Sequence, residues 1–165
     1  IDPNRAKEQV KSVSEVVREG IQDVRGSLNR LRPGALEGRT LKDALEKMIR
    51  EYQTLSNLQV DLHYEWVDVD MDVMIEDTIF RVIQESMTNA VRHGHASRMI
   101  LHFFEDEEDY LIELQDNGVG FETLTYGYGL KQMMERISIL GGQLQFESRD
   151  GFFTRVSLPK YKEGR

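Results

Sequence analysis

The sequence has no cysteine among its 165 residues, and this absence excludes several kinds of site at once. Without thiols there is no disulfide, no cysteine-ligated zinc, no iron–sulfur cluster and no cysteine nucleophile. The sequence also has no apolar run of about 18 residues and does not open with a signal peptide, so we expect no membrane contact by these residues. Hydrophobic residues still make up 39% of the chain, which is enough for a folded core.

Net positive charge is lacking as well, because 29 acidic residues outnumber 21 basic ones and give a formal net charge of −8. A nucleic-acid-binding surface needs clustered Lys and Arg, so we expect no nucleic acid partner. The charge is uneven, since residues 1–40 carry more basic than acidic side chains and residues 41–165 are strongly acidic. This shift predicts two differently built parts.

The first part predicts one long amphipathic helix over residues 4–32. Its apolar residues are three or four positions apart, close to a heptad pattern: Val10, Val13, Val17, Ile21, Val24, Leu28 and Leu31. Pro33 and Gly34 end the helix, because both residues interrupt helical structure. We therefore divide the chain into a helical part over residues 1–34 and a globular domain over residues 35–165.

The second part mixes helices with strands. Apolar spacing predicts helices over residues 41–55, 75–93 and 129–140. Alternating apolar and polar residues predict strands over residues 60–66, 97–104, 110–115, 143–148 and 153–158. This order fits neither repeated βαβ units nor an all-β fold. We expect an α+β fold, a two-layer α/β sandwich in which helices cover one face of a mixed, mostly antiparallel sheet.

Three polar or glycine-rich features are not required by the fold alone, and the first is a stripe on the helix predicted over residues 75–93. Glu85, Asn89 and His93 are spaced at i, i+4 and i+8, so they share one side of that helix. An amide oxygen and a carboxylate on one stripe can hold Mg²⁺ or its waters. Taken alone, such a stripe is more often simply the solvated side of a helix.

The second feature is the segment Asp-Asn-Gly-Val-Gly-Phe at residues 116–121, directly after a predicted strand. Alternate glycines let the backbone turn sharply and approach a ligand, and the carboxylate of Asp116 is an acceptor suited to an exocyclic amine. The same residues are also ordinary turn formers.

The third feature is Gly127-Tyr-Gly129-Leu130 at the start of a predicted helix, where free N–H groups and the helix dipole favour an anion. It is not a Walker A loop, because no Gly-Lys-Ser/Thr follows.

Together and in this order, the three features resemble the ATP-binding domain of histidine kinases, within the GHKL superfamily that includes gyrase B, Hsp90 and MutL. Residues 85–90 resemble its N box, residues 116–121 its G1 box and residues 127–130 its G2 box. The resemblance implies the two-layer ATPase fold of that superfamily, the Bergerat type, with ATP and Mg²⁺ as cofactors.

Further segments narrow the resemblance to sensor kinases of the NarL-type two-component group, which includes the DesK, LiaS and VraS kinases. These segments are residues 84–93, 129–136 and 140–142, together with residues 24–33 at the junction after the second dimerisation helix. The implied partners are a NarL-type response regulator and a second copy of the complete kinase. The parent protein would be a bacterial membrane-bound sensor with this domain in the cytoplasm.

The resemblance assigns a role to each motif residue. Asp116 would accept a hydrogen bond from the adenine amino group, with Gly118 and Gly120 shaping that pocket. Asn89 would bind the Mg²⁺ that bridges the phosphates, and Glu85 would orient water or the metal.

Other roles concern the phosphates and the last hairpin. His93 would lie near the phosphates, and Gly127, Gly129 and Leu130 would form a short lid with N–H groups directed at them. Glu85, Asn89 and His93 are thus the implied catalytic residues. Thr154 matches the Thr of the family's final Gly-x-Thr hairpin, although two phenylalanines separate it from Gly151.

One part of the family pattern is missing, namely the phosphoacceptor motif of the first dimerisation helix. The four histidines, all within the predicted domain, are His63, His93, His95 and His102. We therefore expect a kinase fragment that binds ATP and transfers its γ-phosphoryl group to a histidine outside this chain, without autophosphorylation. The alternatives are an anti-sigma-factor-type serine kinase and a nucleotide-gated dimerisation module without kinase activity.

Overall fold

The computed structural model describes residues 36, 38–67, 69 and 71–160. The helix predicted over residues 4–32, and the part over residues 1–34 that would contain it, lie outside these residues and stay predictions. In the described part of the chain, helices and strands follow in the predicted order: α2 (Leu41–Leu55), β1 (Gln59–Tyr64), α3 (Val73–Arg92), β2 (Arg98–Glu105), β3 (Asp109–Asp116), α4 (Tyr128–Ile139), β4 (Gln143–Ser148) and β5 (Phe152–Pro159).

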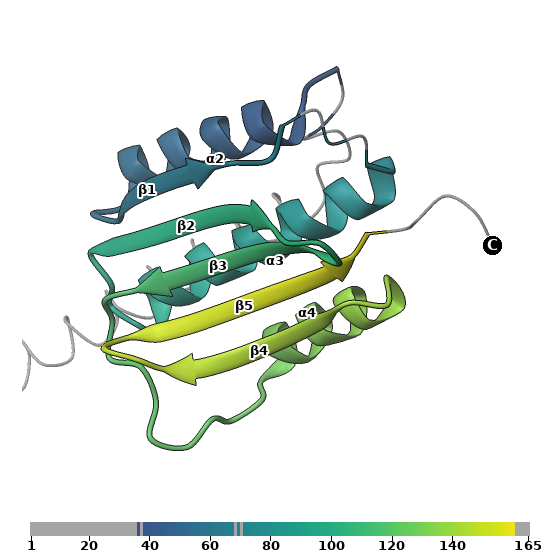
Figure 1. Ribbon diagram of the computed structural model, residues 1–165. Coiled ribbons are helices and arrows are strands. Elements are labelled where there is room, and N and C mark those ends of the chain that lie inside the picture. Colours follow the sequence, from purple (N-terminus) through teal and green to yellow (C-terminus); the bar gives the residue numbers. More distant parts are fainter. Residues whose placement is uncertain (1–35, 37, 68, 70, 161–165) are drawn as a thin grey trace, which may run out of the picture. The chain divides into compact units, whose positions relative to one another are not determined.

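The strands form one sheet in the order β1-β2-β3-β5-β4. β1 runs parallel to β2, and the other three pairs are antiparallel. Figure 1 shows α2, α3 and α4 on the same side of this sheet. The expected α+β sandwich, with helices on one face of a mostly antiparallel sheet, is confirmed.

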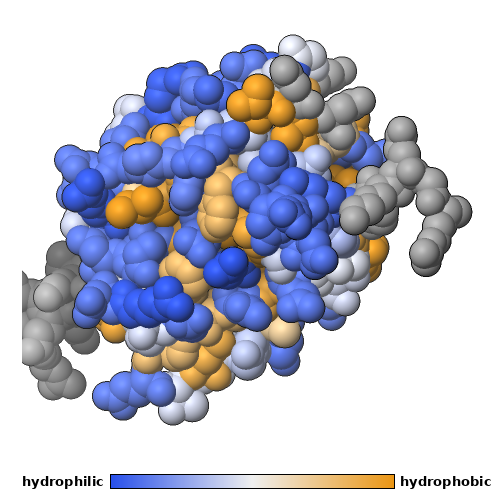
Figure 2. All heavy atoms as spheres, viewed as in Figure 1, coloured by the Kyte–Doolittle hydropathy of each residue, from blue (hydrophilic) through white to orange (hydrophobic). Residues whose placement is uncertain are grey.

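The opposite face of the sheet, seen in Figure 2, is covered mostly by hydrophilic residues. Ion pairs lie on it between neighbouring strands, such as Arg155 with Glu113 at 3.3 Å. The apolar core therefore lies between the sheet and the helices. Its most deeply buried large side chains include Leu45, Ile83, Met87, Leu101, Phe103, Ile112, Leu114, Ile137 and Val156.

The helices begin at capping residues. Thr40 caps α2, since its Oγ1 accepts a hydrogen bond from Asp43 N at 3.1 Å. Asp72 caps α3 by accepting from Met74 N at 2.7 Å, so α3 begins two residues before the predicted start at residue 75. None of the described helices is long and apolar enough to cross a membrane.

The first strand ends earlier than predicted, at Tyr64 rather than residue 66. Trp66 lies beyond the end of the strand, but its side chain is still buried, with 5% exposed. Its indole Nε1 donates a hydrogen bond to Phe104 O at 2.6 Å. A buried indole N–H needs such a partner, so the aromatic ring follows the core while the backbone leaves the sheet.

Candidate nucleotide-binding site

A cavity of about 410 Å³ lies where four element ends meet: the C-terminal part of α3, the start of α4, the end of β3 and the start of β5. The segment from β3 to α4 forms the remaining wall. The residues that line the cavity include nearly all those predicted for the site: Glu85, Asn89, His93, Asp116, Gly120, Gly127, Gly129, Leu130 and Thr154. The exception is Gly118, which does not line the cavity.

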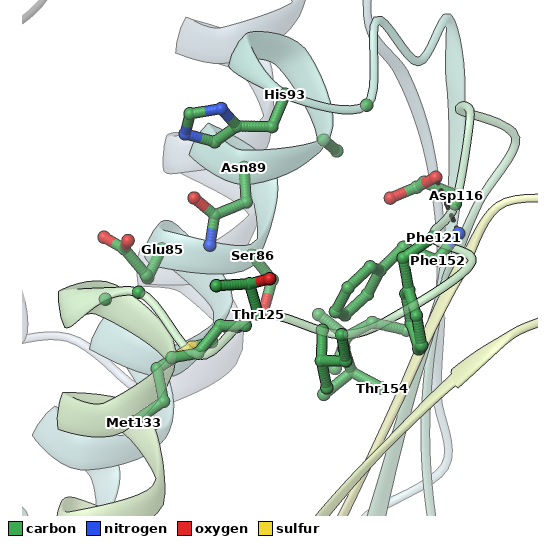
Figure 3. Close-up of a pocket in the computed structure, with 18 of the residues that line it drawn as sticks. Glu85, Ser86, Asn89, His93, Asp116, Phe121, Thr125, Met133, Phe152 and Thr154 are labelled. Atoms are coloured by element: carbon green, nitrogen blue, oxygen red, sulfur yellow. Dashed lines mark hydrogen bonds between the residues drawn. The ribbon is translucent and has the colours of Figure 1, made fainter.

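Asp116 stands at the end of β3 and is 5% exposed. Its Oδ1 accepts two backbone hydrogen bonds, from Gly118 N at 2.8 Å and from Phe152 N at 3.1 Å. Within the described residues no donor is found for Oδ2, and Asp116 lines the cavity (Figure 3). One carboxylate oxygen is thus fixed by the backbone, and the other remains for a ligand that donates a hydrogen bond.

Gly118 does not line the cavity but helps to hold Asp116 in place. Besides donating to the carboxylate, it packs so closely on the backbone of Gly94 that a Cβ has no room. Gly120 has a φ of +61° and lies against Ser148 and Gly151, so a side chain is excluded there by both conformation and space. The two glycines let the loop after β3 fit between the loop that contains Gly94 and the turn between β4 and β5.

The stripe on α3 forms the opposite wall. Figure 3 shows Glu85, Asn89 and His93 along one side of this helix, across from Asp116. Glu85 and Asn89 are half-buried, whereas His93, the residue that caps the helix, is exposed. The prediction that these three residues share one face is therefore confirmed by the geometry.

α2 supports α3 from behind this stripe. The Tyr52 hydroxyl lies 2.7 Å from Thr88 Oγ1 and 3.5 Å from Gln84 O, and Thr88 Oγ1 lies 2.8 Å from the same carbonyl oxygen. Burial raises the pKa of Tyr52, and the nearby carboxylate of Glu85 adds to this effect. The phenol therefore keeps its proton and the bond to α3 persists.

The start of α4 has backbone donors and little side-chain capping. Its N-cap is Gly127, which makes no side-chain cap, and the first turn carries no acidic residue. The first N–H groups of a helix have no partner within the helix and favour negative charge. The carboxylate of Glu85 packs against Gly129 in this turn, so a Cβ would fit there only if the Glu85 side chain moved. Gly127 has a φ of −70° and open space around it, so no such constraint applies there.

The two phenylalanines that precede Thr154 point to opposite faces of β5. Phe152 and Thr154 both line the cavity, because residues two apart on a strand face the same side. Phe153 points to the opposite face, where the Arg149 guanidinium lies 4.2 Å from its ring centroid. Thr154, at 2% exposed, thus reaches the cavity despite the departure from the family hairpin.

Several lining residues were not assigned a role from the sequence. Phe121 and Phe152 form an aromatic wall, with ring centroids 5.3 Å apart. Ser86 and Met133 join α3 to α4, the Ser86 hydroxyl lying 3.9 Å from the Met133 sulfur. Phe121 stands inside the predicted glycine segment and could have been noticed there; the other three depend on contacts between distant segments.

The described residues contain no group of three or more His, Asp or Glu side chains arranged to hold a metal ion alone. A metal at this site would therefore also need other oxygens, such as those of Asn89, a bound ligand or water. This arrangement fits Mg²⁺, which binds through one or two protein oxygens plus substrate phosphates and water.

Two curated proteins are similar to this chain over most of its length. UhpB of Salmonella typhimurium, a signal transduction histidine-protein kinase/phosphatase, is 34% identical over 163 residues, which cover 95% of this chain and 32% of UhpB. The sensor histidine kinase LiaS of Bacillus subtilis is 28% identical over 94% of this chain and 43% of its own length. The chain thus spans less than half the length of these curated relatives.

Solved structures share the fold. The Acinetobacter baumannii histidine kinase AdeS superposes with a TM-score of 0.63 and 19% identity, covering 98% of this chain and 87% of that one. The ATP-binding domain of PrrB from Mycobacterium tuberculosis gives 0.62 and 20% identity, over 73% of this chain and 93% of that one. At this identity the likeness concerns the fold alone.

Residues 74–162 match the sequence profile described as histidine kinase-, DNA gyrase B- and HSP90-like ATPase. These residues make up more than half of the chain and contain the α3 stripe, the loop after β3 and the start of α4. The chain therefore belongs to the family of histidine kinase-, DNA gyrase B- and HSP90-like ATPases, and its cavity lies within the ATP-binding domain.

Proposed function

We propose that this chain is the ATP-binding catalytic part of a sensor histidine kinase. In the complete protein it would transfer the γ-phosphoryl group of ATP to a histidine on a dimerisation helix, for relay to an aspartate of a NarL-type response regulator. The complete kinase would be a homodimer and a membrane-bound sensor with this domain in the cytoplasm. The names of the relatives favour a histidine kinase over a serine kinase or a dimerisation module without kinase activity.

The observation that carries the proposal is the carboxylate of Asp116. One of its oxygens is held by two backbone N–H groups, and the other is available at a cavity large enough for a small ligand. An ionised carboxylate is an acceptor only, so it favours a base with an amino group at this edge. Adenine has such a group, and Phe121 and Phe152 supply an aromatic surface beside it.

The other end of the cavity fits phosphates. The first turn of α4 offers backbone N–H groups, which stabilise anionic oxygens without a basic side chain. Asn89 and Glu85 supply oxygen ligands on the facing helix and would hold Mg²⁺ together with the phosphates. When bound, the metal would neutralise charge that develops on the transferred group.

The protein residues would then bind and orient the substrate. Asp116 would fix the base, Thr154 would line the inner end of its pocket, and the N–H groups after Gly127 would position the phosphate chain. Asn89 and His93 would lie on the phosphate side. Placement of the reacting groups supplies much of the rate enhancement in phosphoryl transfer.

Two measurements test this function in sequence. Calorimetric titration with ATP, with and without Mg²⁺, should show saturable binding that strengthens with the metal. Incubation with radiolabelled ATP and a separately supplied dimerisation domain should then yield acid-labile phosphohistidine on that domain. Binding without phosphohistidine at saturating Mg-ATP would contradict the kinase and favour a nucleotide-gated module. Phosphoserine on a partner would indicate the serine kinase instead.

A further inference from the structure

Asn117 is the residue after Asp116, and it is exposed and does not line the cavity. Its side chain nevertheless makes three hydrogen bonds to Ser97, at the end of the loop between α3 and β2, and to Arg98, the first residue of β2. Oδ1 accepts from Ser97 N and from Arg98 N, both at 2.9 Å, and Nδ2 donates to Ser97 Oγ at 3.0 Å. The backbone N of Asn117 adds a fourth bond, to Arg98 O at 3.1 Å.

The same two segments also meet at the other end of the loop. Val119 N donates to Gly94 O at 3.0 Å, and Gly118 packs against the backbone of Gly94 without room for a Cβ. The loop over residues 93–97 is therefore fastened to residues 117–119 at both of its ends. Side-chain bonds to two consecutive backbone N–H groups restrict the conformations of a loop, because one amide oxygen ties both donors to the same point.

The two fastened segments belong to opposite sides of the cavity. Residues 117–119 directly follow Asp116, which we propose binds the base. Residues 93–97 directly follow α3, and His93 is the last residue of the stripe that we propose faces the phosphates. The connection thus joins the segment that follows the proposed base-binding residue to the segment that follows the phosphate-facing helix.

We propose that Asn117 is a positioning residue, which sets the separation between Asp116 and the phosphate-facing end of α3 without contacting the nucleotide. The inference rests on the proposed function, because it assigns the base to one side and the phosphates to the other. A ligand that spans both sides binds only when the separation is correct. A ligand that contacts only the Asp116 side does not need it.

Loss of the three side-chain bonds, with the backbone bonds between the two segments kept, should therefore lower affinity selectively. If Asn117→Ala leaves the correct separation populated about a tenth of the time, the apparent dissociation constant of a spanning ligand rises about tenfold. Adenosine, which lacks phosphates, should change by less than about twofold. Asp116 itself should stay in place, because Gly118 N and Phe152 N still hold its Oδ1.

Three variants test this step by titration with adenosine and with a non-hydrolysable ATP analogue. Asn117→Ala removes all three side-chain bonds and should show the selective loss. Asn117→Asp keeps an acceptor for both N–H groups, and its second oxygen can accept from the Ser97 hydroxyl, so affinity should stay within about threefold of wild type. Ser97→Ala removes only the bond to its hydroxyl and should lie closer to wild type than Asn117→Ala.

Amide hydrogen exchange gives a readout that needs no ligand. The N–H groups of Ser97 and Arg98 should exchange faster in Asn117→Ala, and their protection should return in Asn117→Asp. Equal loss of adenosine and ATP-analogue affinity in Asn117→Ala would overturn the positioning role, as would unchanged affinity for both. Failure of the wild-type chain to bind ATP would instead contradict the proposed function and leave the exchange result as a separate test of the connection.

Discussion

Replacement of Asp116 by Asn probes the proposed base-binding site while changing almost no volume. In the native site Oδ1 accepts from Gly118 N and Phe152 N, at 2.8 and 3.1 Å, and Oδ2 is left for the ligand. Asparagine has one oxygen and one NH₂ group in the same positions. If the oxygen keeps the two backbone donors, the NH₂ faces the adenine amino group, and two donors oppose each other.

The size of the effect follows from the bond that is lost. A hydrogen bond to a charged acceptor contributes about 1.5–3 kcal/mol, so Asp116→Asn should cost about 2–3 kcal/mol of binding free energy. That cost corresponds to about 30–150-fold weaker ATP binding. The free energy of unfolding should fall by only about 1 kcal/mol, because the amide oxygen still satisfies both backbone N–H groups.

The assay is calorimetric titration with two nucleotides that differ at position 6 of the purine, ATP with an amino group and its analogue with a carbonyl oxygen. Asn can donate to the carbonyl, so the variant should lose affinity for ATP and lose little or none for the analogue. Thermal unfolding of the same samples establishes that the domain is intact. A loss of ATP affinity below about threefold, or an equal loss for both nucleotides, would refute the assignment of Asp116.

Three further changes test other parts of the molecule. Gly118→Ala should lower the free energy of unfolding by about 2 kcal/mol or more, because the new Cβ would meet the backbone of Gly94. Gly127→Ala should change it by less than about 0.5 kcal/mol, because the space around Gly127 is open. Urea unfolding of the two variants measures both changes, and equal effects would contradict the packing argument. Asn89→Ala should weaken ATP binding more with Mg²⁺ than without it; equal losses in the two titrations would remove Asn89 from the metal site. Burial raises the pKa of Tyr64 from 10.0 to about 12, so the folded state holds this proton more tightly and stability is lost as the pH rises from 10 towards 12. Tyr64→Phe should lose less stability over that range than wild type, and parallel urea midpoints at pH 9 and 11.5 would argue against it.

The elements of the fold could be predicted because their signals are local. Apolar residues at helical spacing define α2, where Leu41, Ala44 and Leu45 are buried as expected. The strand order could not be predicted, since nothing in the sequence of β5 says that it pairs with β3 as well as with β4. Such pairing depends on which strands the helices leave accessible when the two layers close.

In the candidate site, too, some residues could be predicted from the sequence and others could not. Asp116 and Asn89 were predicted because an acceptor at a strand end and an amide on a helix stripe are visible in the sequence itself. The role of Phe152 was not visible, because it depends on β5 lying beside β3, which directs its N–H to a carboxylate 36 residues earlier in the chain. Ser86 and Met133 were missed for the same reason, since they meet only when α4 packs on α3.

The acidic character of the chain and its proposed polyanionic ligand are compatible because of how the cavity is lined. Among the described residues that line it there are two carboxylates, Glu85 and Asp116, and no Lys or Arg. A triphosphate placed there meets no Lys or Arg side chain that could offset its charge, so Coulomb repulsion opposes binding unless another positive charge is present. The N–H groups at the start of α4 supply part of it, equivalent to about half an elementary charge. A divalent cation on Asn89 would add two further positive charges, which is why the metal dependence of binding, more than the affinity itself, tests whether this cavity works as proposed.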